Sequence, residues 1–153
     1  MKCTSAFLFS AVFSYGQKHI SKPKKKDHEI SYEDSIFLMP GKMKPLFFLR
    51  LVLNRKNQAN YITLQNDFPE DWVTKSDVDT LMKLISSKEK CKCIVNPLSS
   101  YLPTSEKGNL GGYAIAFIKS FKEKKRIDFG LYSCPHTKEQ DVLNLRKWWR
   151  MFP

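Results

Sequence analysis

Three cysteines and one histidine carry the most distinctive side-chain chemistry in this chain. Cys91 and Cys93 are separated by one residue, and Cys134 stands two residues before His136. Tetrahedral zinc accepts three thiolates and an imidazole, but zinc knuckles usually place two residues between their paired cysteines. Residues at i and i+2 of a strand only share a face. We therefore expect no metal site and no cofactor, and a zinc site formed by Cys91, Cys93, Cys134 and His136 is the alternative. In a secreted chain we expect a disulfide from Cys134 to Cys91 or Cys93, with reduced strand cysteines as the alternative.

A group of cations is suited to binding rather than to reaction. Five basic residues fall within eight positions, interrupted by Glu123, and they are Lys119, Lys122, Lys124, Lys125 and Arg126. Cations placed along a polyanion give an affinity that depends on salt and not on sequence. We predict that this cluster forms the tip of a β-hairpin and contacts a sulfated glycan or a phosphate backbone. The alternative is an ordinary solvated turn.

Residue patterns typical of catalysis are weak. Cys134 and His136 are close in sequence, but no third residue that would orient the histidine can be identified. The acidic residues around 70–79 include Asp77 and Asp79, whose negative charges favour the positive start of a helix. We therefore expect a protein that is not an enzyme.

The elements that would position these residues follow from apolar periodicity. Residues 45–54 alternate as a strand with both faces apolar, and residues 61–64 form a short partner strand. Residues 76–88 form the clearest helix, because Val78, Leu81, Met82 and Ile85 fall on one stripe after a Ser76 cap. Residues 91–95 form a β-branched strand, and residues 96–112, which contain two prolines and three glycines, form a long loop.

The C-terminal part adds a hairpin and a second helix. Residues 113–121 and 126–134 are predicted as two strands joined by the Lys-rich turn. Thr137 and Gln140 have the spacing of a capping box, so a helix should follow them. The fold class is thus α+β: a small mixed or antiparallel sheet with a C-terminal β-hairpin, packed by two helices.

The first forty residues determine the expected compartment. Residues 1–16 combine a basic start, an uncharged apolar stretch and small residues before Gln17, which together indicate a signal peptide. An N-terminal strand rich in phenylalanine is the alternative. Residues 17–40 are expected to form a flexible basic arm, and residues 41–153 a single domain. The arm carries Lys22, Lys24, Lys25 and Lys26, which would bind a polyanion in a secreted protein or act as a nuclear localisation signal in an uncleaved one.

Composition limits the classes that remain. The 153 residues have a formal charge of +11 and are 42% hydrophobic, which is enough for a folded core and argues against complete disorder. No apolar run approaches the 18 or so residues of a membrane span. Residues 76–153 hold fourteen basic against eight acidic side chains, and such an excess favours polyanionic partners.

The sequence thus predicts a small, secreted, basic, non-enzymatic binding protein, either a signalling factor or a matrix-associated ligand. Its partner would be a protein receptor or a sulfated glycan. The alternative is an intracellular, nuclear adaptor or nucleic-acid-associated protein, and a nucleic-acid partner is expected only in that case.

Overall fold

The computed structural model describes residues 35–55 and 58–152. The predicted signal peptide and most of the predicted arm, with Lys22 to Lys26, lie outside these residues. The elements follow in the order β1 (Phe37–Leu38), the 3-10 helix η1 (Pro40–Lys42), α1 (Pro45–Leu53), β2 (Tyr61–Leu64), α2 (Lys75–Leu84), β3 (Lys90–Cys91), β4 (Cys93–Val95), β5 (Gly108–Asn109), α3 (Leu110–Glu123), β6 (Tyr132–Ser133) and α4 (Glu139–Met151).

Two small sheets confirm the α+β class. The larger sheet has the strand order β1-β2-β4-β6, in which β1, β2 and β4 are parallel and β6 is antiparallel to β4. The second sheet is the antiparallel pair β3 and β5. Because β1 and η1 begin before residue 41, the sheet includes part of the segment predicted as the arm.

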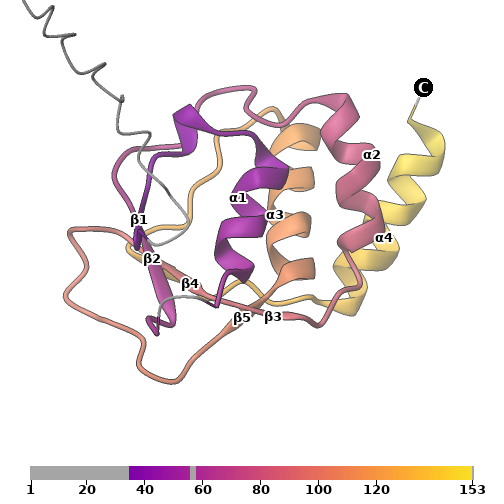
Figure 1. The fold of residues 1–153 in the computed structure, drawn as a ribbon. Helices are drawn as coiled ribbons and strands as arrows, with labels where there is room; N and C mark the ends of the chain where they lie inside the picture. Colours follow the sequence, from indigo (N-terminus) through magenta and orange to yellow (C-terminus); the bar gives the residue numbers. More distant parts are fainter. Residues whose placement is uncertain (1–34, 56–57, 153) are drawn as a thin grey trace, which may run out of the picture.

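Helix α3 is the centre of the molecule. It contacts α1, α2 and α4, and Figure 1 shows it standing between α1 and α2. Its residues from Leu110 to Ile118 are buried except for the partly buried Ala116, so this part of the helix is apolar on all sides. A helix with this pattern is stable only inside a core. None of the helices in the described part of the chain is both long and apolar enough to cross a membrane.

An aromatic cluster joins the helices to the chain segments beside them. Phe48 of α1 and Phe117 of α3 have ring centroids 5.8 Å apart, and both contact Phe68 and Trp72. The Trp72 indole donates a hydrogen bond of 2.7 Å to the Met43 carbonyl, which satisfies its polar edge. Edge-to-face rings of this kind add about 0.5–1.5 kcal/mol per pair beyond their burial. This cluster fixes the segment that leads into α2.

The strand predicted for residues 45–54 is wrong, because these residues form α1. Pro45 occupies the first turn, where a missing N–H costs nothing and the fixed φ angle suits a helix. The buried residues Pro45, Phe48, Leu49 and Val52 follow the i, i+3, i+4, i+7 spacing of a helical stripe. Phe47 is apolar but exposed on the opposite side of the helix. Its presence makes the sequence resemble a strand with two apolar faces.

The predicted C-terminal β-hairpin is also wrong. Residues 113–121 lie in α3, and residues 126–134 contribute only the short strand β6. The side chain of Asn109 accepts a hydrogen bond of 3.1 Å from the Gly112 N–H and caps the helix. A helix buried on every face has no polar side, so its apolar pattern does not distinguish it from a buried strand.

Two glycines at the start of α3 permit close packing of the chain. A Cβ atom at Gly112 would lie 2.5 Å from the Pro135 carbonyl oxygen, and one at Gly111 would lie 2.6 Å from the Ile85 carbonyl oxygen. Any larger residue would therefore collide with backbone. These glycines are placed by tertiary contact, although in the sequence they resemble part of a loop.

Other predicted elements are present with shifted boundaries, but the Thr137–Gln140 capping box is wrong, and the predicted loop 96–112 already contains β5 and the start of α3. Residues 61–64 form β2, and the helix predicted at residues 76–88 is α2, capped by Thr74 and Asp77 instead of Ser76. The strand predicted at 91–95 is divided at Lys92 into β3 and β4. Thr137 does not cap α4, since its hydroxyl contacts Asn109 and donates to the Ser87 carbonyl at 3.0 Å.

Candidate functional site

A disulfide joins Cys93 to Cys134. The antiparallel pairing of β4 and β6 sets Ile94 opposite Ser133, so one further step along the register places the two cysteines opposite each other. Their Cα atoms are 4.5 Å apart, the separation typical of a non-hydrogen-bonded antiparallel pair. Of the two pairings predicted from the sequence, the structure has the one through Cys93.

Cys91 is kept apart from this bridge by the break at Lys92. Its side chain belongs to the core cluster beside the helices, whereas Cys93 is bonded to Cys134. Burial, with a smaller contribution from Glu89, raises the pKa of the Cys91 thiol to about 12. The two cysteines therefore do not act as a pair of ligands, and the described residues contain no group of three or more side chains arranged to hold a metal.

The predicted cationic cluster lies at the C-terminal end of α3 instead of on a hairpin tip. Lys124 has a left-handed conformation with φ 50°, and its N–H donates to the Phe121 and Ser120 carbonyls. The Lys125 N–H also donates to the Ser120 carbonyl at 3.1 Å, so the turn closes the last carbonyls of the helix. This turn projects the residues that follow it away from the helix axis.

A groove opens beside this turn. It has a volume of about 710 Å³ and lies between the end of α3, the end of α4 and the segment 70–74 before α2. The aromatic side chains that line it are Phe121, Trp148 and Phe152, and the cations are Lys122, Lys124, Lys125 and Arg126. We call this the α3–α4 groove. Glu70 and Asp71 also line it, from the segment before α2.

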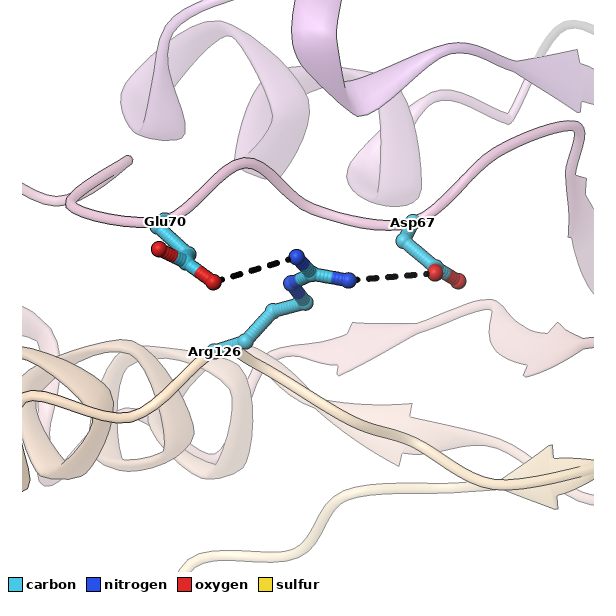
Figure 2. A network of polar contacts seen from close by, with 3 residues as sticks. All are labelled: Asp67, Glu70 and Arg126. Atoms are coloured by element: carbon cyan, nitrogen blue, oxygen red, sulfur yellow. Dashed lines mark hydrogen bonds and ion pairs between the residues drawn. The ribbon is translucent and has the colours of Figure 1, made fainter.

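The cations of the cluster differ in how far they are already engaged. Lys119 lies outside the groove lining and forms an ion pair of 2.7 Å with Asp141 of α4. Figure 2 shows Arg126 between Asp67 and Glu70, with N–O distances of 3.4 and 3.3 Å. The side chains of Arg126, Asp67 and Glu70 are all substantially exposed, so these contacts hold Arg126 in place without contributing much stability.

The other three cations remain directed to solvent or to the aromatic wall. The Lys122 ammonium is 5.6 Å from the centroid of the Trp148 ring, within the range of a cation–π contact. Lys125 reaches Glu123 only at 3.9 Å, and Lys124 has no ion pair among the described residues. The positive charge available to a ligand in the groove is therefore carried by Lys122, Lys124 and Lys125.

Of the two tryptophans near the end of α4, Trp148 lines the groove and Trp149 does not, and neither lies fully in the core. Trp148 is 6.5 Å from Phe121 between ring centroids, and Trp149 stacks on Phe152 at 5.2 Å. Both are partly buried and pack against the core cluster. Two neighbouring residues on a helix point about 100° apart, so each ring presents one side to solvent.

A second pocket was not anticipated from the sequence. It has a volume of about 430 Å³ and lies where the end of α1 meets β3. Its cations are Arg55, Lys90, Lys92 and Lys107, and none of the described residues that line it is acidic. These residues are spread over more than fifty positions and become neighbours through the contact of α1 with β3 and the pairing of β3 with β5. We call this the β3 pocket.

In comparisons with known proteins, no family model, curated protein or solved structure matches this chain.

Proposed function

We propose that this chain is a small, secreted, non-enzymatic binding protein that holds a polyanion in the α3–α4 groove. The observation that carries the proposal is the presence of three available lysines on a groove with an aromatic wall. The ligand class is a sulfated glycan or an acidic segment of a protein receptor.

The chemistry of the groove suits such a ligand. Lys122, Lys124 and Lys125 would neutralise sulfate or carboxylate groups, and each contact would release counterions from the polyanion. The aromatic side chains would pack against the less polar faces of sugar rings or side chains. Glu70 is paired with Arg126, so Asp71 is the remaining acidic side chain of the lining and would repel an anion close to it.

A structural explanation for the same lysines has to be separated from binding. The C-terminal end of a helix carries roughly half a negative charge, and nearby cations stabilise it by about 0.3–1 kcal/mol at exposed positions. One well-placed lysine would provide this effect. Binding predicts instead that all three lysines contribute to affinity, whereas their effect on unfolding remains small.

Retention on immobilised heparin in a salt gradient tests the groove. Lys122→Ala, Lys124→Ala and Lys125→Ala together should lower the eluting salt, and the dependence of log affinity on log salt should lose about 2 units of slope. The control removes the same charge at three exposed lysines outside the groove lining, Lys42, Lys83 and Lys138. Equal elution of the two triple variants would reject the groove as the binding site.

The disulfide supports the secreted part of the proposal. Structural disulfides persist in oxidising compartments and are rare in the cytosol and nucleus. Mass spectrometry of the mature chain from its natural source tests this separately: a protein that begins at Gln17 is expected. An intact or acetylated Met1 would contradict secretion and would favour the nuclear alternative.

A further inference from the structure

We propose that the β3 pocket binds a small molecule carrying a tetrahedral oxyanion, that is, a phosphate or sulfate ester. The pocket is lined by four cations and by no acidic residue of the described chain, and it also has three side-chain amides and an apolar part. This site does not depend on the α3–α4 groove, because the two lie at opposite ends of α3. That helix has 14 residues and is therefore roughly 20 Å long.

The strand register concentrates the charge. In the antiparallel pair of β3 and β5, Lys90 is opposite Asn109 and Cys91 is opposite Gly108. Lys92 directly follows β3 and Lys107 directly precedes β5, and both line the pocket. Like charges gathered around one pocket repel each other, so an anion bound among them would offset that repulsion. Figure 1 shows β3 and β5 side by side below the end of α1.

Lys92 lies deepest among these cations. Only 7% of its surface is exposed, and burial lowers the pKa of its ammonium. Its own N–H donates to the Val52 carbonyl at 3.0 Å, which holds the residue against the end of α1. Lys90, Lys107 and Arg55 are exposed, so the pocket has one buried cation and three at its open side. An anion entering the pocket would first be attracted by the three exposed cations.

The end of α1 does not account for this much charge. Its C-terminal carbonyls carry roughly half a negative charge, which one cation would offset. Two of these carbonyls already accept backbone hydrogen bonds, Val52 from Lys92 and Leu51 from Asn54. The acidic neighbours Glu89 and Glu106 do not line the pocket, although Glu89 acts on the Cys91 thiol, and the Glu106 carboxylate accepts a hydrogen bond from the Tyr101 hydroxyl at 3.3 Å.

The size and the apolar part of the pocket define the rest of the ligand. A volume of 430 Å³ lies within the range of small-molecule sites and exceeds what one inorganic anion fills. Val52, Leu53 and Ala59 supply apolar surface, and the amides of Asn54, Gln58 and Asn60 supply polar contacts. The Asn60 amide already donates to the Thr104 carbonyl at 2.5 Å, which fixes its orientation. A sugar phosphate or sugar sulfate has the matching size and polarity.

Isothermal titration calorimetry of the full chain at low salt tests the proposal. The titrants are inorganic phosphate, sulfate, glucose 6-phosphate, glucose 6-sulfate and, as a neutral control, glucose. We expect saturable binding of the anions, tighter for the esters than for the inorganic ions, and none of glucose. The tighter of the two esters would identify the source as phosphate or sulfate chemistry.

Variants at exposed positions locate the binding. Arg55→Ala with Lys107→Ala should weaken ester binding at least tenfold. Neither Lys42→Ala with Lys83→Ala nor the groove variant at Lys122, Lys124 and Lys125 should change it. Absence of saturable binding, or the same affinity in the pocket variant as in the unmodified chain, would overturn the proposal. Loss of ester binding in the groove variant alone would also overturn it, and it would leave the proposed function standing.

A spectroscopic readout that does not depend on the variants is the titration of Lys92 itself. After reductive methylation with ¹³C, the lysine methyl groups can be followed by NMR as the pH rises. Burial keeps the Lys92 pKa below its usual value, and saturating glucose 6-phosphate should raise it. A Lys92 pKa that is unchanged by the ester would contradict an anion bound beside it.

Discussion

Loss of the Cys93–Cys134 disulfide should cost a large part of the stability of this domain. The bridge joins residues separated by 41 positions. In the chain-entropy description, closing a loop of that length lowers the entropy of the unfolded chain enough to contribute about 4 kcal/mol. Since small domains have unfolding free energies of about 5–15 kcal/mol, Cys134→Ser should remove a quarter or more of the total.

Equilibrium unfolding in urea, followed by tryptophan fluorescence, measures this loss. For a denaturant slope of about 2 kcal/mol per molar, the midpoint should fall by about 2 M. Reductant should shift the unmodified protein to a similar midpoint and leave Cys134→Ser unchanged. Cys91→Ala keeps the bridge and should remain sensitive to reductant. The reasoning would be refuted if Cys134→Ser unfolded at the original midpoint, or if Cys91→Ala lost its sensitivity to reductant.

Four further predictions test separate parts of the structure. Gly112→Ala should lower the free energy of unfolding in urea by at least about 2 kcal/mol, whereas Gly41→Ala, which meets only ordinary contacts, should change it little. Lys124→Gly should raise the stability by up to about 1 kcal/mol, because the residue is left-handed, and should still weaken heparin retention. Thr74→Ala should cost about 1 kcal/mol through loss of the α2 capping box, measured by thermal unfolding. Because Cys91 has a folded pKa of about 12 against 9.0 when exposed, stability should fall as the pH rises from 9 towards 12, and less so in Cys91→Ala.

The outcomes that would contradict these predictions are equally specific. Gly112→Ala with unchanged stability would mean that α3 does not pack tightly on Pro135. Lys124→Gly with unchanged retention would remove that lysine from the groove. An unaffected Thr74→Ala would argue against the cap, and identical pH profiles with and without Cys91 would place its thiol in water.

The sequence predicted an element correctly where its local residue pattern matches its burial in the fold. Strand β2 was predicted because Tyr61 to Leu64 is short, apolar and bounded by polar turns. Helix α2 was predicted because it is amphipathic and lies on the surface, so its stripe of Val78 and Leu81 contrasts with polar neighbours. A disulfide from Cys134 to Cys91 or Cys93 was predicted for a secreted chain, and the structure has the bridge to Cys93.

The errors concern elements whose environment is set by the whole fold. Helix α3 is buried on all sides, so its pattern around Tyr113 and Phe117 has no polar face to reveal a period of 3.6. Pro45 was a usable helix-start signal that apolar alternation outweighed. The break at Lys92, which separates Cys91 from Cys93, arises because the chain passes from one sheet to another there. No local pattern in the sequence indicates such a passage.

The two candidate sites also differ in whether a local sequence pattern reveals them. The cluster from Lys122 to Arg126 is contiguous, so the sequence identified it, although the structure places it at a helix end and pairs Arg126 with acidic residues. The β3 pocket assembles Arg55, Lys92 and Lys107 from three separate segments, which meet through the pairing of β3 with β5 and the packing of α1 on β3. A site whose residues are contiguous in the sequence can therefore be recognised from the sequence, whereas a site assembled from distant segments cannot.

NMR titration of the ¹⁵N-labelled chain with a heparin hexasaccharide tests the central claim most directly. Polyanion binding in the α3–α4 groove predicts the largest shift changes at the backbone amides from Ser120 to Arg126 and at the Trp148 indole N–H. These changes should diminish together as salt is raised. Shift changes concentrated away from this groove, or none at low salt, would contradict the account.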